Sequence, residues 1–239
     1  MIWRDEKLKN DNLSHSVYQH LLDMILSGQV KPGDRIPEAK VAGDLNISRT
    51  PIRGALLQLA NEGIVNVYPN RFAEVAHWDD ETILQIGIVR VQLDVLAVRL
   101  AIHNASNADF LRINRHSKLC LEAARNNDIA NRIKEDCSFH LGLSEISKNA
   151  QLYKLMKNIY LRIEFLQSWR EMYMIDLDEQ YSQHEEIFNA LMSRDEQAAS
   201  RHVARHGIHF HNLDDEYPVE VFMGAAPLHE TNANVPQMK

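Results

Sequence analysis

Apolar positions in the first part of the chain recur at helical spacing and are separated by turn residues. In "HSVYQHLLDMILS", residues 15–27, apolar side chains stand three and four positions apart, and Gly28 follows as a helix stop. "KPGDRIPE" interrupts the pattern, "EAKVAGDL" predicts a short helix, and a longer helix is expected from Arg49 to Glu62, with Ser48 as its N-cap. The predicted order is helix, short helix, tight turn, longer helix.

The pattern then changes twice. "IVNVYPNRFAEVAHW" alternates apolar and polar residues around a Pro-Asn turn, which predicts a two-stranded ribbon. From Asp79 onward only helical spacing remains, so a domain boundary is expected near Trp78. The predicted helices span residues 79–103, 107–126, 129–147, 150–170, 177–193 and 196–213. Short polar turns join them, as in an antiparallel bundle.

These patterns predict a mainly α protein in three parts. Residues 1–77 have the element order of a winged helix-turn-helix, in which the second helix of the pair enters the DNA major groove. Residues 78–217 are expected to form an all-α antiparallel bundle. Residues 218–239, which include three prolines, are expected to be an arm or a disordered tail.

Composition narrows the class of protein. The chain has 239 residues, of which 45% are hydrophobic, enough to form two cores. No apolar run of about 18 residues occurs and the start is highly charged, so we expect a cytoplasmic protein without membrane contact. Cys120 and Cys137 fit neither a disulfide framework nor a paired zinc motif. The net charge of −7 does not indicate nucleic-acid binding, but the stretch Leu45–Asn61 contains two arginines and no acid.

The basic stretch belongs to a longer motif. "PGDRIPEAKVAGDLNISRTPIRGALLQLANEGIVNVYPNR" resembles the DNA-binding domain of GntR-family bacterial transcription regulators. The resemblance implies that the recognition helix begins at Ser48 and that Arg71 lies at the tip of the wing. The residues expected to contact DNA are Arg35, Ser48, Arg49, Thr50, Arg53 and Arg71.

The motif departs from the family in two places. Gly54 stands where the family usually has glutamate, and glycine weakens a helix interior by about 1 kcal/mol relative to alanine. Phe72 follows the wing arginine where glycine is usual, so a wing contact that needs glycine's close backbone approach is in doubt.

Three helices of the second part carry polar residues on inward faces. Asp136 and His140 lie four residues apart, and a buried carboxylate must be paired, bound to a metal or beside water. His184 and His206 each share a stripe with apolar residues. Each histidine alone is more often a hydrogen-bonded core residue than a ligand. Together, one aspartate and three histidines suit zinc, nickel or a similar divalent ion.

The same region resembles the FCD-type ligand-binding domain found behind GntR-type heads. Its pattern pairs Asp and His four apart, then has a His on a later helix and another His twenty-two residues beyond, matched here by Asp136, His140, His184 and His206. "VRVQLDVLAVRLA" adds to the likeness, with Arg90 and with Asp94 where glutamate is usual. The resemblance implies that the four residues are the metal ligands, with zinc or nickel as the expected ion. His202, one turn before His206, is the rival ligand or an outer partner.

In FCD-type domains, the cavity at this metal site binds organic acids or related metabolites. The resemblance therefore implies a homodimeric regulator that binds a pseudo-palindromic operator in double-stranded DNA and responds to a small carboxylate near the metal. Arg90 and Arg162 are the candidates for pairing the effector carboxylate. We expect no enzymatic activity. Two alternatives stay open: a metal-dependent hydrolase, because a bound cation lowers the pKa of water, and a regulator with a purely structural metal.

Overall fold

The computed structural model describes residues 2–69, 71–169, 177–213 and 216–223, without the side chains of residues 2–12 and 177–178. Contacts divide the chain into two units: residues 1–77 with residues 161–171, and residues 78–160 with residues 172–239. Each unit is described by itself. The domain boundaries expected from the sequence stay predictions.

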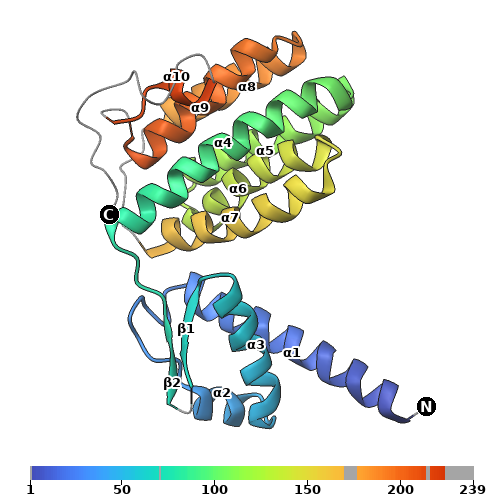
Figure 1. Ribbon diagram of the computed structural model, residues 1–239, viewed down its shortest axis with the longest axis vertical. Helices are drawn as coiled ribbons and strands as arrows, with labels where there is room; N and C mark the ends of the chain where they lie inside the picture. The colour runs from blue at the N-terminus through green and yellow to red at the C-terminus, as the bar shows by residue number, and fades with distance from the viewer. Residues whose placement is uncertain (1, 70, 170–176, 214–215, 224–239) are drawn as a thin grey trace. The chain divides into compact units, whose positions relative to one another are not determined.

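The first unit contains the predicted order of elements (Figure 1). It has α1 (Ile2–Leu26), α2 (Glu38–Asp44), α3 (Arg49–Asn61), β1 (Val65–Tyr68) and β2 (Phe72–Val75). The strands pair antiparallel, with Val65 opposite Val75 and Tyr68 opposite Phe72. The expected helix-turn-helix with a small β wing is confirmed.

The helix α1 begins at Ile2, whereas the apolar pattern predicts a start near residue 15. The pattern is visible only where side chains face a core, and among the described side chains of α1, residues 13–26, the first buried ones are Val17 and Tyr18. Residues 2–14 contain no glycine or proline and include helix formers such as Glu6, Lys7 and Leu8, so the helix continues toward the N-terminus.

Apolar faces of α1, α3 and the ribbon form the core of this unit. The buried side chains include Leu21, Ile52, Leu56, Leu59, Ile64 and Val75. Their positions in α3 follow a three- and four-residue spacing, which leaves the opposite face of that helix in solvent.

The second unit is a bundle of helices, as predicted. Its helices are α4 (Asp80–Asn104), α5 (Asn107–Arg125), α6 (Ile129–Ile146), α8 (Leu177–Met192), α9 (Glu196–His211) and α10 (Val219–Met223), together with residues 150–160 of α7 (Ala150–Trp169), whose remaining residues belong to the first unit. The side chain of Asp79 caps α4, a capping box of Ser106 and Asp109 starts α5, and Asp195 caps α9. These caps set where the helices begin.

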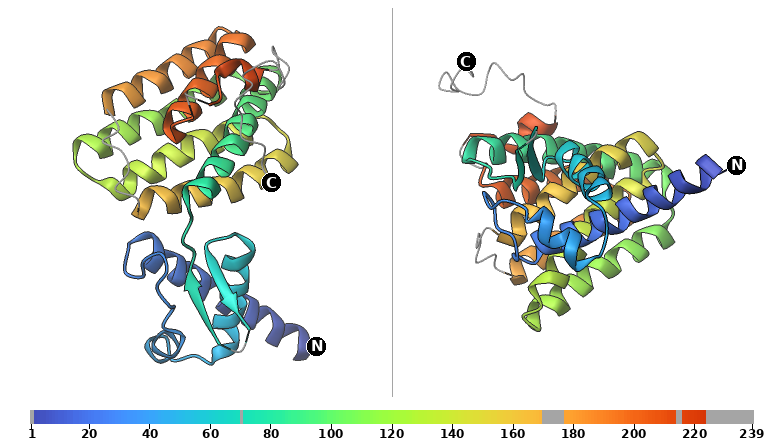
Figure 2. Two further views of the ribbon diagram at one scale, coloured as in Figure 1. Left: turned by 60° about the vertical axis from the view of Figure 1, so that its left-hand side comes forward. Right: turned by 90° about the horizontal axis from the view of Figure 1, so that it is seen from below.

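Within the bundle, α4 packs against α9 on one side and α6 on the other (Figures 1 and 2). Two glycines permit the close approach of α4 and α9. A Cβ at Gly87 would lie 2.6 Å from His211 Cγ, and a Cβ at Gly207 would lie 2.8 Å from Val91 Cγ2. Both distances are shorter than ordinary carbon contacts, so these positions require glycine for this packing.

The segment expected to be an arm or tail includes a short helix. In α10, Phe222 is buried, which ties residues 219–223 to the bundle. Residues 224–239 lie outside the described part of the chain. None of the described helices combines the length and apolar content needed to cross a membrane.

Candidate nucleic-acid interface and metal centre

The N-terminal end of α3 presents polar side chains to solvent. Ser48 occupies the N-cap position in an extended conformation, as predicted, but its side chain makes no capping hydrogen bond. Ser48, Arg49, Thr50 and Arg53 are all exposed. The first turn of α3 therefore has free side chains and unpaired backbone N–H groups where a phosphate is favoured.

Four of the residues expected to contact DNA line one surface groove. Arg35 from the loop, Arg49 and Arg53 from α3, and Arg71 beside the ribbon meet there. Tyr68 and Phe72 add aromatic side chains from the ribbon. A groove with four guanidinium groups suits a polyanion, because arginine bonds both phosphates and guanine edges.

The two departures from the family motif each have a local explanation. The ring of Phe72 lies under Arg35, whose guanidinium carbon is 3.9 Å from the ring centroid, so an aromatic ring supports this arginine. A Cβ at Gly54 would lie 3.2 Å from Ser14 Oγ on α1. The glycine thus accommodates the close packing of α3 on α1.

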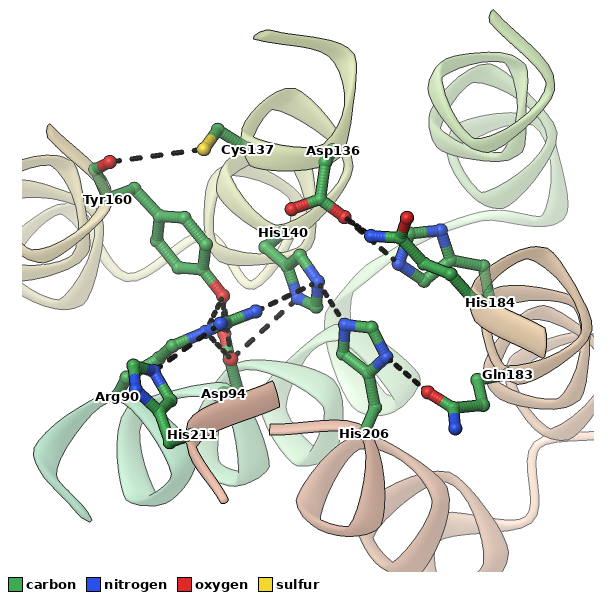
Figure 3. A network of polar contacts seen from close by, with 11 residues as sticks. Arg90, Asp94, Asp136, Cys137, His140, Tyr160, Gln183, His184, His206 and His211 are labelled. Carbon is green, nitrogen blue, oxygen red and sulfur yellow. Dashed lines mark hydrogen bonds and ion pairs between the residues drawn. The ribbon is translucent and has the colours of Figure 1, made fainter. Parts of the chain in front are cut away.

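In the second unit, the four predicted metal ligands meet in the core. Asp136 and His140 come from α6, His184 from α8 and His206 from α9, and their side chains point toward one another (Figure 3). At most 2% of any of them is exposed. One ligand atom from each lies within 4.8 Å of the others, and among the described residues these four form the only such group.

The spacing of these atoms suits a single ion. His140 Nε2 lies 3.2 Å from His206 Nε2, and His184 Nε2 lies 3.5 Å from Asp136 Oδ1. Nitrogen ligands bind zinc at about 2.0–2.1 Å, so neighbouring ligands on one ion are roughly 3 Å apart. His184 Nε2 is buried and makes no hydrogen bond. The four residues could therefore hold a metal ion.

Side chains around the cluster contact the candidate ligands. Gln180 Nε2 donates to Asp136 Oδ1 at 2.7 Å, and His206 Nδ1 lies 2.8 Å from Gln183 Oε1. Asp94 Oδ2 is 3.7 Å from His140 Nδ1. Such partners fix the ring orientation and tautomer of metal-binding histidines.

Arg90 is fully buried beside the cluster (Figure 3). Its Nε donates to Tyr160 Oη at 3.1 Å and lies 3.4 Å from Asp94 Oδ2, while the Tyr160 hydroxyl donates to Asp94 at 2.6 Å. Its Nη2 is 3.4 Å from His140 Nε2, and its Nη1 is 3.5 Å from His211 Nε2. A positive charge is thus held at the edge of the cluster.

Burial keeps the histidines neutral. It lowers the pKa of His140 and His206 well below the ordinary value, and the nearby charge of Arg90 acts in the same direction. Burial also lowers the pKa of His184 to about 4, although Asp136 opposes the shift. Neutral imidazoles are the form that binds metals, so these side chains are in the required state near neutral pH.

Not every predicted site residue joins the cluster. His202 Nδ1 lies 3.0 Å from Glu186 Oε2, at the side of the bundle. Arg162 donates from Nε to the backbone oxygen of Glu62 at 2.9 Å, within the first unit, whereas Arg90 is brought to the cluster. The roles of both arginines in effector binding stay predictions.

Sequence reasoning missed three residues at the site: Gln180, Gln183 and Tyr160. The two glutamines lie on α8 with His184, one turn before it and directly before it. Their closeness to His184 in the sequence could have identified them as residues of the site. Tyr160 gave no such signal, because its partners Arg90 and Asp94 are on a helix far away in the sequence.

Comparison with known proteins gives the same division of the chain. Residues 13–75 match the model of bacterial regulatory proteins of the gntR family, and residues 85–209 match the FCD domain. The Nta operon transcriptional regulator of Aminobacter aminovorans is 31% identical over 187 residues, which cover 77% of this chain and 85% of that protein. The transcriptional regulator McbR of Escherichia coli is 26% identical over 157 residues, 66% of this chain and 71% of that protein.

Solved structures share the fold. The structure of E. coli McbR/YncC covers 85% of this chain and 99% of its own, with a TM-score of 0.70 and 21% identity. A putative GntR regulator from Rhodococcus sp. RHA1 covers 90% and 99%, with a TM-score of 0.73 and 20% identity.

These findings decide between the regulator and the enzyme. The matched relatives are transcriptional regulators, so the hydrolase alternative is not supported. The chain therefore belongs to the GntR family of bacterial regulatory proteins, in the group that carries an FCD domain, and it is a DNA-binding transcription regulator.

Proposed function

We propose that this regulator binds a pseudo-palindromic operator as a homodimer, and that a small organic acid modulates operator binding from a divalent metal site. The ligands of the ion are Asp136, His140, His184 and His206, and the ion is zinc or nickel, which mixed oxygen and nitrogen ligands suit. The observation that carries the proposal is the buried guanidinium of Arg90 beside this cluster.

The position of Arg90 favours an acidic effector. Arg90 Nη2 lies 3.4 Å from His140 Nε2, the nitrogen that faces His206 and would offer its lone pair to an ion. An ion that binds His140 Nε2 takes up this lone pair, and Nη2 then needs another acceptor. A carboxylate that occupies an open position of the ion supplies the acceptor and neutralises charge, because guanidinium and carboxylate match in geometry.

The DNA-binding half of the proposal depends on the arginine groove. Arg49→Ala should weaken specific operator binding by about 1–3 kcal/mol, which is roughly 5- to 150-fold, because it removes a side chain placed to contact a base edge or phosphate. An operator can be selected with the wild-type protein from a pool of random duplexes, and affinity measured at fixed salt. The matched control is Arg112→Ala, which also removes one arginine charge, but from an exposed position on α5. Equal operator affinity in Arg49→Ala and the control would refute the assignment.

The effector half predicts protection against heat. Acetate, lactate or citrate should raise the melting temperature of the metal-loaded protein, because a ligand that binds only the native state adds stability. Arg90→Lys should keep the metal but lose most of this protection, since lysine cannot bond a carboxylate bidentately. If no small carboxylate protects the loaded wild-type protein, a purely structural metal becomes the better account.

A further inference from the structure

The facing sides of α8 and α9 carry three side-chain pairs, each between a residue of α8 and a histidine of α9. Glu186 Oε2 lies 3.0 Å from His202 Nδ1, and Glu179 Oε1 lies 3.9 Å from His209 Nε2. Between them, Gln183 Oε1 lies 2.8 Å from His206 Nδ1. The outer pairs join a carboxylate to a partly exposed histidine. The central pair joins an amide to a buried histidine of the cluster.

The hydrogen bond from His206 has a chemical consequence. Because an amide oxygen only accepts, the proton of neutral His206 must be on Nδ1. The lone pair is then on Nε2, the atom that lies 3.2 Å from His140 Nε2 inside the cluster. Gln183 thus selects the tautomer in which His206 can bind an ion.

The charge of the site depends on the same residue being an amide. Among the described residues, the charged side chains that are fully buried around the cluster are Arg90, Asp94 and Asp136, whereas Tyr160 and the histidines are neutral. These sum to one negative charge. A divalent ion would leave one net positive charge, which a single carboxylate neutralises. A glutamate in place of Gln183 would cancel that charge before any effector arrived.

We propose that Gln183 is a positioning and specificity-determining residue: its amide holds His206 in the metal-binding tautomer without adding charge, so that the loaded site attracts a monoanionic carboxylate. The inference rests on the proposed metal and effector site and names the residue that sets its affinity for anions. It explains why the central pair departs from the carboxylate–histidine pairs on either side.

Two substitutions separate the two effects. Gln183→Ala removes the acceptor, and metal-stripped protein should then bind Zn²⁺ and Ni²⁺ about 10- to 100-fold more weakly in chelator competition. Gln183→Glu restores an acceptor, so its metal affinity should equal or exceed that of the wild type. In titrations of the loaded protein with acetate and lactate, however, Gln183→Glu should bind the acid about tenfold or more weakly, because its charge repels the anion. A purely structural role would not lower the acid affinity while leaving the metal affinity intact.

The matched controls are Gln197→Ala and Gln197→Glu, which make the same changes at an exposed position of α9 and should leave both affinities unchanged. Melting curves of the metal-free variants report any general loss of stability. The positioning role is overturned if Gln183→Ala binds metal as tightly as the wild type, or if Gln183→Glu loses as much affinity as the alanine variant. The charge effect is overturned if Gln183→Glu binds the acid as tightly as the wild type. A wild-type protein that binds no divalent ion would overturn the proposed function together with this inference, whereas the other outcomes overturn the inference alone.

Discussion

Replacing His184 and His206 together with alanine should abolish stoichiometric metal binding. The double variant keeps only Asp136 and His140, both from α6, so the ion would lose its links to α8 and α9. The apparent free energy of zinc binding to the four-ligand structural sites of zinc-finger peptides is about 10–16 kcal/mol. Removing two of four ligands should therefore lower the metal affinity by more than about a thousandfold. Elemental analysis after dialysis measures the loss directly.

The control for this prediction replaces two other histidines, both on α9, the helix that carries His206. His202→Ala with His209→Ala also removes two histidines, but these pair with glutamates outside the cluster. This control should retain one ion per chain. Retained metal in the His184/His206 variant would mean that other residues bind it, and metal loss from the control would mean that His202 or His209 takes part in binding the ion.

The metal-free protein should lose stability steeply as the pH falls below about 6.5. In the folded chain, burial lowers the pKa of His140, His184, His206 and His211. These histidines are neutral in both states above pH 6.5. Below it, the unfolded chain takes up protons that the folded chain does not, and the free energy of unfolding decreases. Each histidine should contribute a loss of about 1 kcal/mol near pH 5.5.

Asp94 opposes this trend, because burial raises its pKa to about 6 and the folded state then binds its proton more readily than the unfolded state. The four histidines outnumber it, so the net slope keeps its sign. Urea unfolding of the metal-free protein at pH 7.5, 6.5 and 5.5 measures the effect. The His184/His206 alanine variant should show a clearly shallower dependence. A wild-type profile that is flat over this range would show that the histidines are not held neutral.

The sequence predicted features that repeat along a single helix. The start of α3 at Arg49 and the N-cap position of Ser48 depend on nearby residues, and the structure has both as expected. The start of α1 was missed because the apolar pattern marks burial, which among the described side chains begins at Val17, whereas the helix begins at Ile2.

Contacts between helices were harder to predict. The gathering of Asp136, His140, His184 and His206 was anticipated because each had an inward position and the family pattern supplied their combination. The pairing of Gln183 with His206 depends on the register of α8 against α9, which neither helix encodes by itself. The same limit applies to Arg162, whose chemistry suits a carboxylate but whose partner is a backbone oxygen.

The central claim is that a small acid acts on operator binding through the metal site. The most direct test measures the operator affinity of zinc-loaded and metal-stripped wild-type protein, each with and without a carboxylate selected by the melting screen. Coupling between two sites is typically about 5- to 150-fold in affinity. We expect the acid to change the operator affinity of the loaded protein by a factor in this range, and to leave the stripped protein unchanged. An acid effect of equal size in both forms would contradict the account.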